Sequence, residues 1–130
     1  MRHDLKIVME LPKLQKRVLI VDDNRDAADI IADYLRLFGI QALAVYDGET
    51  AFHEACHFKP HVIFLDIGMP GKNGYEVALL MRQTAVLAET RLIALTAWDD
   101  PATKEKVRAV GFQDHIVKPV TLDYLLKALE

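Results

Sequence analysis

Short apolar runs alternate with longer segments of helical periodicity along the chain. Five runs are apolar at nearly every consecutive position, at residues 18–21, 42–45, 62–65, 92–95 and 115–117. Consecutive apolar positions are typical of strands that are covered on both faces, as in a parallel sheet. The pattern therefore predicts five buried strands.

Each apolar run is followed by a segment long enough to form a helix. The first helix is predicted to end at Gly39, the second to span residues 48–58 behind Asp47 as N-cap, and the third residues 74–85. The fourth begins with Asp100 as N-cap and has few apolar side chains, which predicts weak anchoring. The last helix covers residues 121–129. The predicted buried face of the first helix consists of Ile30, Ile31, Tyr34, Leu37 and Phe38.

Five successive strand–helix units predict an α/β fold with a parallel sheet, helices on both faces and right-handed crossovers. Ligands of such sheets bind beyond the carboxyl ends of the strands. Residues 1–16 are interpreted as a leader or linker, and residues 17–130 as a single domain. The abrupt end of the last helix at Glu130 is typical of a segment taken from a longer chain.

Composition narrows the class of protein. The chain has 130 residues, 52% of them hydrophobic, and a formal net charge of -3. This mild charge argues against general binding to nucleic acid or to an anionic membrane. A single cysteine excludes a disulfide framework, and no apolar stretch approaches the ~20 residues of a membrane helix. We therefore expect a cytoplasmic domain.

Four of the five predicted strands end in groups that can bind a metal ion or a phosphoryl group. Because the ends of parallel strands meet at one edge of a sheet, we expect these groups to lie close together. The residues concerned are Asp22, Asp23, Asp66, Thr96, Ala97 and Lys118.

Three carboxylates at one edge repel one another unless a cation compensates their charge. Mg2+ prefers oxygen ligands and is commonly held by one or two carboxylates together with water. We predict that Asp23 and Asp66 bind Mg2+ directly and that Asp22 acts through water. Lys118 would balance part of the remaining charge and leave a site suited to a phosphoryl group. Asp66, at the end of the central strand, is the predicted nucleophile.

Four stretches of the sequence resemble the receiver domain of bacterial response regulators. They are "VLIVDDN", "IFLDIGMPGKNGYEVA", "LIALTA" and "GFQDHIVKPV", in the order of that family. The resemblance covers roughly residues 16–129. It implies a flavodoxin-like fold with strand order 2-1-3-4-5. It also implies a phosphoacceptor switch of a two-component phosphorelay rather than an ordinary enzyme.

The resemblance implies a role for each residue of the predicted site. Asp66 would accept a phosphoryl group from a histidine kinase or its phosphotransfer domain. Mg2+ would be held by Asp23, Asp66 and the backbone carbonyl of Gly68, with Asp22 acting through water. Lys118 would contact a phosphoryl oxygen.

A conformational switch is also implied by the resemblance. Thr96 would turn its hydroxyl towards the phosphoryl group, helped by the Ala97 amide, and the Lys118–Pro119 peptide bond would be cis. This movement would change the surface of the fourth helix and fifth strand, where an unknown output partner would bind.

Two residues depart from the family pattern. His115 occupies the switch position, which is usually Tyr or Phe, and this predicts a weaker or pH-sensitive movement. Trp98 is large for its position, and we hypothesise that it shields the acyl phosphate from water. Trp98 and Gly68 are thus the predicted modulating positions.

Several alternatives remain open from the sequence. The stretch "HEACH" matches the zinc-peptidase pattern through His53, Glu54 and His57, although adventitious metal binding by the histidine pair fits it better. A phosphorylation-independent interaction module is another alternative. The chain is expected to be either a stand-alone regulator or the receiver segment of a hybrid sensor kinase.

Overall fold

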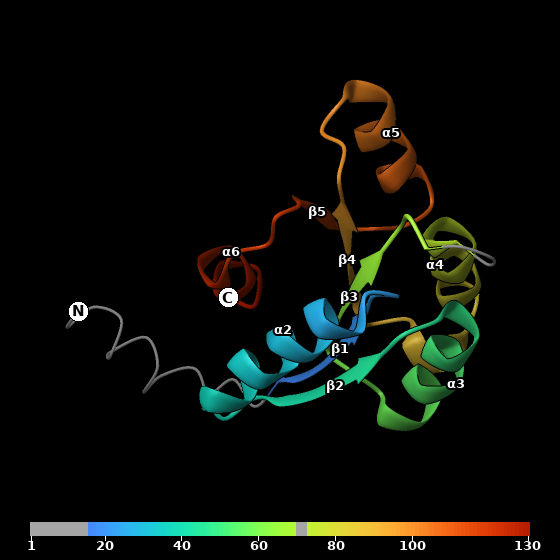
Figure 1. Cartoon of the computed structure of the whole chain (residues 1–130). Helices are drawn as coiled ribbons and strands as arrows, with labels where there is room; N and C mark the ends of the chain where they lie inside the picture. The colour runs from blue at the N-terminus through green and yellow to red at the C-terminus, as the bar shows by residue number, and fades with distance from the viewer. Residues whose placement is uncertain (1–15, 70–72) are drawn as a thin grey trace.

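A computed structural model of the chain describes residues 16–69 and 73–130 and contains one five-stranded sheet (Figure 1). The strands are β1 Arg17–Val21, β2 Gln41–Val45, β3 Val62–Asp66, β4 Arg91–Thr96 and β5 Asp114–Val117. The helices are α2 Arg25–Leu37, α3 Gly48–Phe58, α4 Gly74–Arg82, α5 Pro101–Ala109 and α6 Leu122–Ala128, with the short 3-10 helix η2 Ala85–Leu87. The predicted leader lies outside the described residues, apart from Lys16.

All four strand pairs are parallel, and their order is β2-β1-β3-β4-β5. The predicted α/β fold and strand order are therefore confirmed. Because β3 is the middle strand, the residue at its carboxyl end lies in the middle of the edge where ligands bind in this fold.

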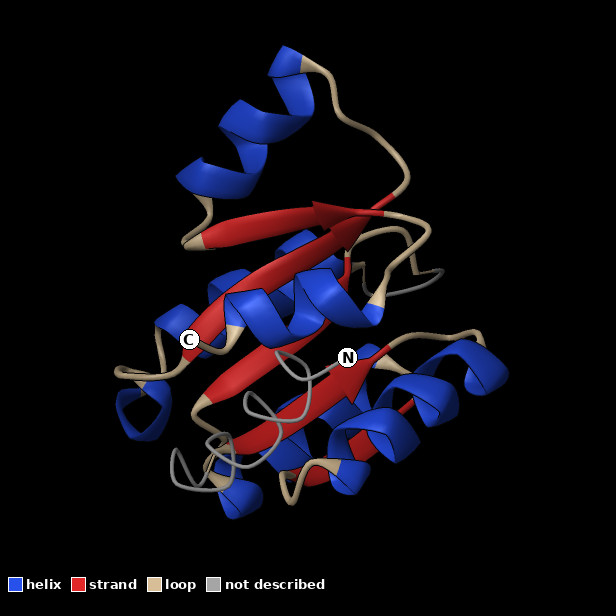
Figure 2. Cartoon of the chain, turned by 90° about the vertical axis from the view of Figure 1, so that its left-hand side faces the viewer, coloured by secondary structure: helices blue, strands red, loops and turns tan. Residues whose placement is uncertain are grey.

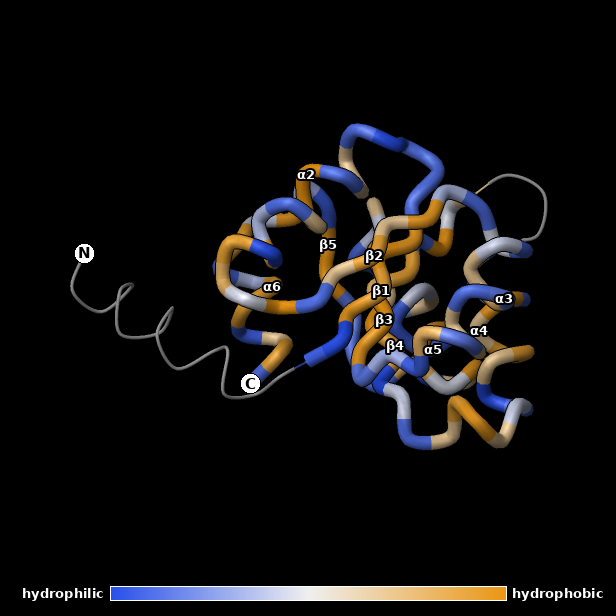
Figure 3. The backbone as a smooth tube through the Cα atoms, turned by 90° about the horizontal axis from the view of Figure 1, so that it is seen from below, coloured by the Kyte–Doolittle hydropathy of each residue, from blue (hydrophilic) through white to orange (hydrophobic). Residues whose placement is uncertain are grey.

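Helices cover both faces of the sheet. Helices α2 and α6 pack on one face, and α3, α4 and α5 on the other (Figure 1). Figure 2 is viewed from the side of α2 and α6, which lie in front of the strands. Successive residues of β1 point into opposite apolar layers: Val18 and Ile20 towards α2, Leu19 and Val21 towards α3. The strands accordingly form the largely hydrophobic centre seen in Figure 3.

Helix starts follow the predicted capping residues. Asp47 accepts a hydrogen bond from the Thr50 amide at 2.7 Å, and Asp100 accepts one from the Thr103 amide at 2.7 Å. Each satisfies an N–H group that has no partner inside the helix. Both N-cap predictions are confirmed.

The predicted buried face of α2 is correct for Ile31, which is buried, and for Phe38, which is partly buried against the same core, but it is wrong for the other three residues. Ile30, Tyr34 and Leu37 are 52%, 46% and 76% exposed, whereas Ala28 and Ala32 are fully buried. Ile31 and Leu35 complete the buried stripe. Small alanine side chains let the helix backbone approach the sheet closely, so the large apolar side chains of the neighbouring stripe remain outside.

The predicted span of α4 and the predicted anchoring of α5 had different outcomes. Helix α4 ends at Arg82 and is followed by η2, so the predicted span of 74–85 joined two elements. Helix α5 buries only Val107 among its residues, which confirms the expected weak anchoring.

Among the described residues, no helix is long and apolar enough to cross a membrane.

Candidate phosphoryl and metal site

The carboxyl edge of the sheet brings together the acids that the sequence singled out. Asp22 follows β1, Asp66 ends β3, and both are buried, with exposures of 1% and 6%. Asp23 is exposed beside them. One carboxylate oxygen of each of the three residues lies within 4.8 Å of the others. The three acids therefore form one cluster, as expected from the topology.

Lys118 joins this cluster from the end of β5. Its Nζ lies 3.1 Å from Asp22 Oδ2 and 3.2 Å from Asp66 Oδ2. The Asp22 Oδ1 atom accepts a hydrogen bond from the Asn24 amide at 3.0 Å, and Asp66 Oδ1 accepts one from the Gly68 amide at 2.9 Å. One ammonium group against three carboxylates leaves two negative charges, which suits a divalent cation with oxygen ligands.

Charge and burial perturb the titration of this cluster. The pKa of Asp66 is raised, chiefly by burial and also by the negative charge of Asp22. The hydrogen bond from the Gly68 amide lowers this pKa but does not cancel the rise. Burial alone would lower the pKa of Lys118, but the neighbouring carboxylates of Asp66 and Asp22 raise it overall. The lysine therefore stays charged, and a bound cation would favour the ionised form of Asp66.

A pocket of about 380 Å3 opens onto Asp66. Its wall includes Thr96, whose buried hydroxyl accepts a hydrogen bond from the Trp98 amide at 3.0 Å. In this arrangement the hydroxyl is held by the backbone of Trp98. The full lining is Asp66, Ile67, Gly68, Tyr75, Thr96, Ala97, Trp98 and Lys118.

Two aromatic residues line this pocket. Trp98 lines it while remaining 66% exposed. Tyr75, at the start of α4, lines it as well, and the Lys106 ammonium of α5 lies 4.3 Å from the centre of the Tyr75 ring. The sequence analysis missed Tyr75, because no pattern in the sequence brings α4 and α5 together over the pocket.

Gly74 is a second residue that the sequence analysis missed as part of the site. A Cβ atom at this position would lie 2.5 Å from Ile67 Cα and 2.6 Å from the Asp66 carbonyl oxygen. Glycine therefore lets α4 begin against the backbone that carries Asp66. Gly68 is less restricted, because a Cβ atom there would meet Asp66 Oδ1 at 3.5 Å.

The Lys118–Pro119 peptide bond is cis, as the resemblance implied. His115, at the predicted switch position, lies on β5 with its Nε2 3.4 Å from Asp99 Oδ1. Lys104 of α5 approaches the same carboxylate at 3.4 Å. Hydrogen bonds from His115 and then Lys104 lower the pKa of Asp99. The imidazole is thus directed towards the loop before α5 and α5 itself.

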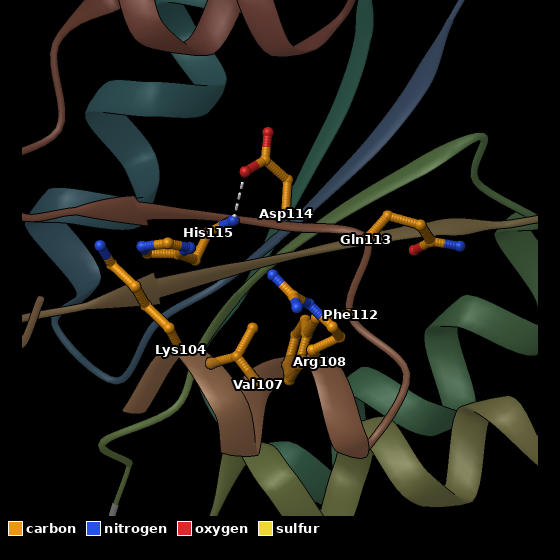
Figure 4. Close-up of a pocket in the computed structure, with 7 residues that line it drawn as sticks. All are labelled: Lys104, Val107, Arg108, Phe112, Gln113, Asp114 and His115. Atoms are coloured by element: carbon orange, nitrogen blue, oxygen red, sulfur yellow. Dashed lines mark hydrogen bonds between the residues drawn. The ribbon is translucent and has the colours of Figure 1, made fainter. Parts of the chain in front are cut away.

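His115 also lines a pocket of about 190 Å3 between α5 and β5 (Figure 4). Figure 4 shows Lys104 and His115 side by side at one end, with Arg108 nearer the middle. Val107 of the same helix supplies an apolar wall. This pocket lies on the helix and strand that were expected to respond to phosphorylation.

The "HEACH" histidines do not belong to either pocket. His53 and His57 are exposed on α3, and Ala51 and Ala55 form its buried side. Within residues 16–69 and 73–130, the one group of three or more acidic, histidine or cysteine ligands close enough to share an ion is the aspartate cluster. A third protein ligand for a peptidase zinc ion is therefore missing from the described part of the chain.

Comparison with known proteins identifies the family of this site. The family described as the response regulator receiver domain matches residues 18–130. The chain belongs to this family. Receiver domains are signalling switches of two-component systems, bind Mg2+ at an acidic site and interact with histidine kinases or phosphotransfer proteins.

Individual relatives agree with this assignment. Protein PilG of Pseudomonas aeruginosa is 28% identical over 114 residues, which cover 88% of this chain and 84% of PilG. The chemotaxis protein CheY4 of Vibrio cholerae is 30% identical, with a TM-score of 0.84 over 88% of this chain and 96% of CheY4. The receiver domain of Francisella response regulator 1452 is 26% identical, with a TM-score of 0.80 over 88% and 93% of the two chains.

Proposed function

We propose that this receiver domain is a Mg2+-dependent phosphoacceptor and that Asp66 is the phosphorylated residue. The observation that carries the proposal is the position of Asp66. Its buried carboxylate ends the central strand, contacts Lys118 at 3.2 Å and opens onto the pocket that Thr96 and Trp98 line. A phosphoryl group attached there would have cationic and hydrogen-bonding groups around it.

In the proposed reaction, a carboxylate oxygen of Asp66 forms a bond to phosphorus. The bond from phosphorus to the imidazole nitrogen of a donor phosphohistidine breaks, and its electron pair returns to that ring. Lys118 remains beside Asp66 and balances negative charge on the phosphoryl oxygens. The Gly68 amide holds the other carboxylate oxygen in place.

The acid cluster supports Mg2+ as the cofactor. Asp23 and Asp66 would hold the ion together with the Gly68 carbonyl, and Asp22 would act through water. When bound, Mg2+ supplies charge neutralisation for both the acids and the incoming phosphoryl group. Asp22 is already hydrogen-bonded to Lys118 and the Asn24 amide, which fits an indirect role.

The switch would begin at Thr96. Its hydroxyl leaves the Trp98 amide and turns towards the phosphoryl group, which the Ala97 amide also contacts. The rearrangement would reach the surface of α5 and β5, where His115 is held by Asp99 and where α5 is weakly anchored. Trp98 would shield the phosphoryl group from water.

A histidine kinase or its phosphotransfer domain would be the donor, in the cytoplasm. The output partner would read the α5 and β5 surface. The domain would work either alone or as the receiver segment of a hybrid sensor kinase, with residues 1–16 as leader or linker. Mg2+-dependent phosphorylation is not needed by a pure interaction module, so one experiment separates the two functions.

That experiment is labelling with a small phosphodonor, with and without Mg2+. We expect Mg2+-dependent labelling of the wild-type chain and none of Asp66→Asn. Asp33→Asn is a matched control, because Asp33 is an exposed acid on α2 that pairs with Arg36 at 3.1 Å. Labelling that persists in Asp66→Asn would remove Asp66 from its role, and an unlabelled wild type would favour the interaction module.

A further inference from the structure

The outer face of α3 carries two histidines that the phosphoryl site does not use. His53 and His57 are one helical turn apart and both are exposed. Residues four apart on a helix lie on the same face. Their ring centres are 4.6 Å apart, with 48° between the ring planes. Two imidazoles therefore face solvent as a close pair.

A hydrogen bond within this pair selects the nitrogen that is free to bind. The Nδ1 atom of His57 lies 2.9 Å from the backbone carbonyl oxygen of His53. A carbonyl oxygen can only accept, so Nδ1 of His57 carries the proton and the lone pair of the neutral ring is on Nε2. Histidine ligands of metal ions commonly donate their second ring N–H to a carbonyl in this way.

We propose that His53 and His57 form a bidentate chelate site for a divalent transition-metal ion such as Zn2+, separate from the proposed magnesium site at the sheet edge. An ion about 2.0–2.1 Å from each nitrogen needs those two nitrogens roughly 3.3 Å apart in tetrahedral geometry. Small side-chain rotations bring rings with centres 4.6 Å apart to this separation.

The two sites offer different ligand atoms and therefore favour different metal ions. Imidazole nitrogen favours zinc, copper and nickel, whereas carboxylate and carbonyl oxygen favour magnesium. In the described part of the chain, the histidine pair has no third acidic, histidine or cysteine ligand within sharing distance. Water therefore fills the remaining coordination positions, and the site binds a metal ion without the ligand set of a peptidase.

The test is a Zn2+ titration of the full chain, prepared without an affinity tag and followed by calorimetry. Every chain in this comparison also carries Asp23→Asn and Asp66→Asn, because these two changes remove binding of Zn2+ to the acid cluster. The chain with these two changes alone is called the background chain. We expect one Zn2+ ion per chain. His53→Gln and His57→Gln should each weaken binding by about tenfold or more, since the second imidazole acts as an intramolecular ligand.

His115→Gln is the matched control and should leave Zn2+ affinity unchanged. A Zn2+ affinity in either His53→Gln or His57→Gln equal to that of the background chain would overturn the proposal, as would an equal loss in His115→Gln. A second readout needs no variant: substoichiometric paramagnetic Ni2+ should broaden the imidazole NMR signals of His53 and His57 before those of His61 and His115. Broadening of the His61 or His115 signals before those of His53 and His57 would also overturn the proposal.

Discussion

Replacing Lys118 with methionine isolates the electrostatic part of the site. The change keeps an unbranched side chain of similar length and removes the ammonium group that lies 3.1 Å from Asp22 and 3.2 Å from Asp66. Both carboxylates remain buried. We expect the variant to be less stable than the wild type when Mg2+ is absent, because two like charges then lack their counter-ion.

The magnitude follows from these distances. At an effective dielectric constant of about 20, each contact near 3 Å corresponds to roughly 5 kcal/mol of attraction before desolvation is subtracted. Breaking a buried ion pair by removing one partner costs about 3–5 kcal/mol. The Lys118 side chain is 32% exposed, which weakens both contacts. We therefore expect a loss of about 2–3 kcal/mol in the free energy of unfolding.

The loss should depend on pH. Burial raises the pKa of Asp66. A carboxyl group with a raised folded-state pKa contributes stability below its unfolded-state pKa, and this contribution is lost as the pH rises through the folded-state pKa. Lys118 lowers the pKa of Asp66, so its removal raises that pKa further. The gap between variant and wild type should narrow as the pH falls from neutral to about 5.

Urea denaturation in chelator, in excess Mg2+ and at the two pH values measures these effects. Mg2+ should restore part of the lost stability by replacing the missing positive charge. Lys104→Met is the control: Lys104 is 49% exposed and pairs with Asp99 at 3.4 Å, so its removal should change stability by less than about 1 kcal/mol. A Lys118→Met variant as stable as the wild type, or a loss insensitive to both pH and Mg2+, would refute the electrostatic argument.

Three further predictions concern the same edge of the sheet. Gly74→Ala should reduce the free energy of unfolding, measured by urea denaturation, by about 1–3 kcal/mol and should slow phosphorylation, because its Cβ atom would overlap the backbone of Ile67. Gly68→Ala should reduce the free energy of unfolding by less. Trp98→Ala should lose its phosphoryl group several-fold faster in a decay assay, and an unchanged lifetime would remove the shielding role. Mg2+ affinity measured by calorimetry should fall as the pH drops through the raised pKa of Asp66, since protons compete for the same oxygens; an affinity that stays constant would count against Asp66 as a ligand.

The strands were predictable because their signal is simple, whereas their order was implied by the resemblance to receiver domains. Buried parallel strands are apolar on both faces, so each appeared as a short run of nearly continuous apolar residues. The capping residues Asp47 and Asp100 were predictable for a similar reason, because one side chain bonds to an amide three residues away. The positions of the strands and of the helix caps depend on local sequence alone.

The buried face of α2 shows where such a reading fails. The exposed side chains of Ile30, Tyr34 and Leu37 are larger than the alanines on the buried face. The hydrophobicity of single residues does not indicate how closely a helix can pack on a sheet. Small side chains such as those of the buried Ala28 and Ala32 allow close packing. Side-chain size alone therefore does not identify the covered face of this helix.

The grouping of Asp22, Asp23, Asp66 and Lys118 at one edge followed from the topology, since parallel strands end together. Contacts between helices could not be predicted from the sheet topology. Lys106 of α5 over Tyr75 of α4, and Gly74 against the Asp66 backbone, depend on tertiary packing. No spacing in the sequence encodes either contact.

The central claim is that separate strand ends build one Mg2+ site, and calorimetric titration with Mg2+ tests it most directly. Asp23→Asn should weaken Mg2+ binding by about tenfold or more, because it removes a proposed ligand. Asp26→Asn, an exposed acid in the first turn of α2, should bind as the wild type does. Wild-type affinity in Asp23→Asn, or an equal loss in both variants, would contradict the account.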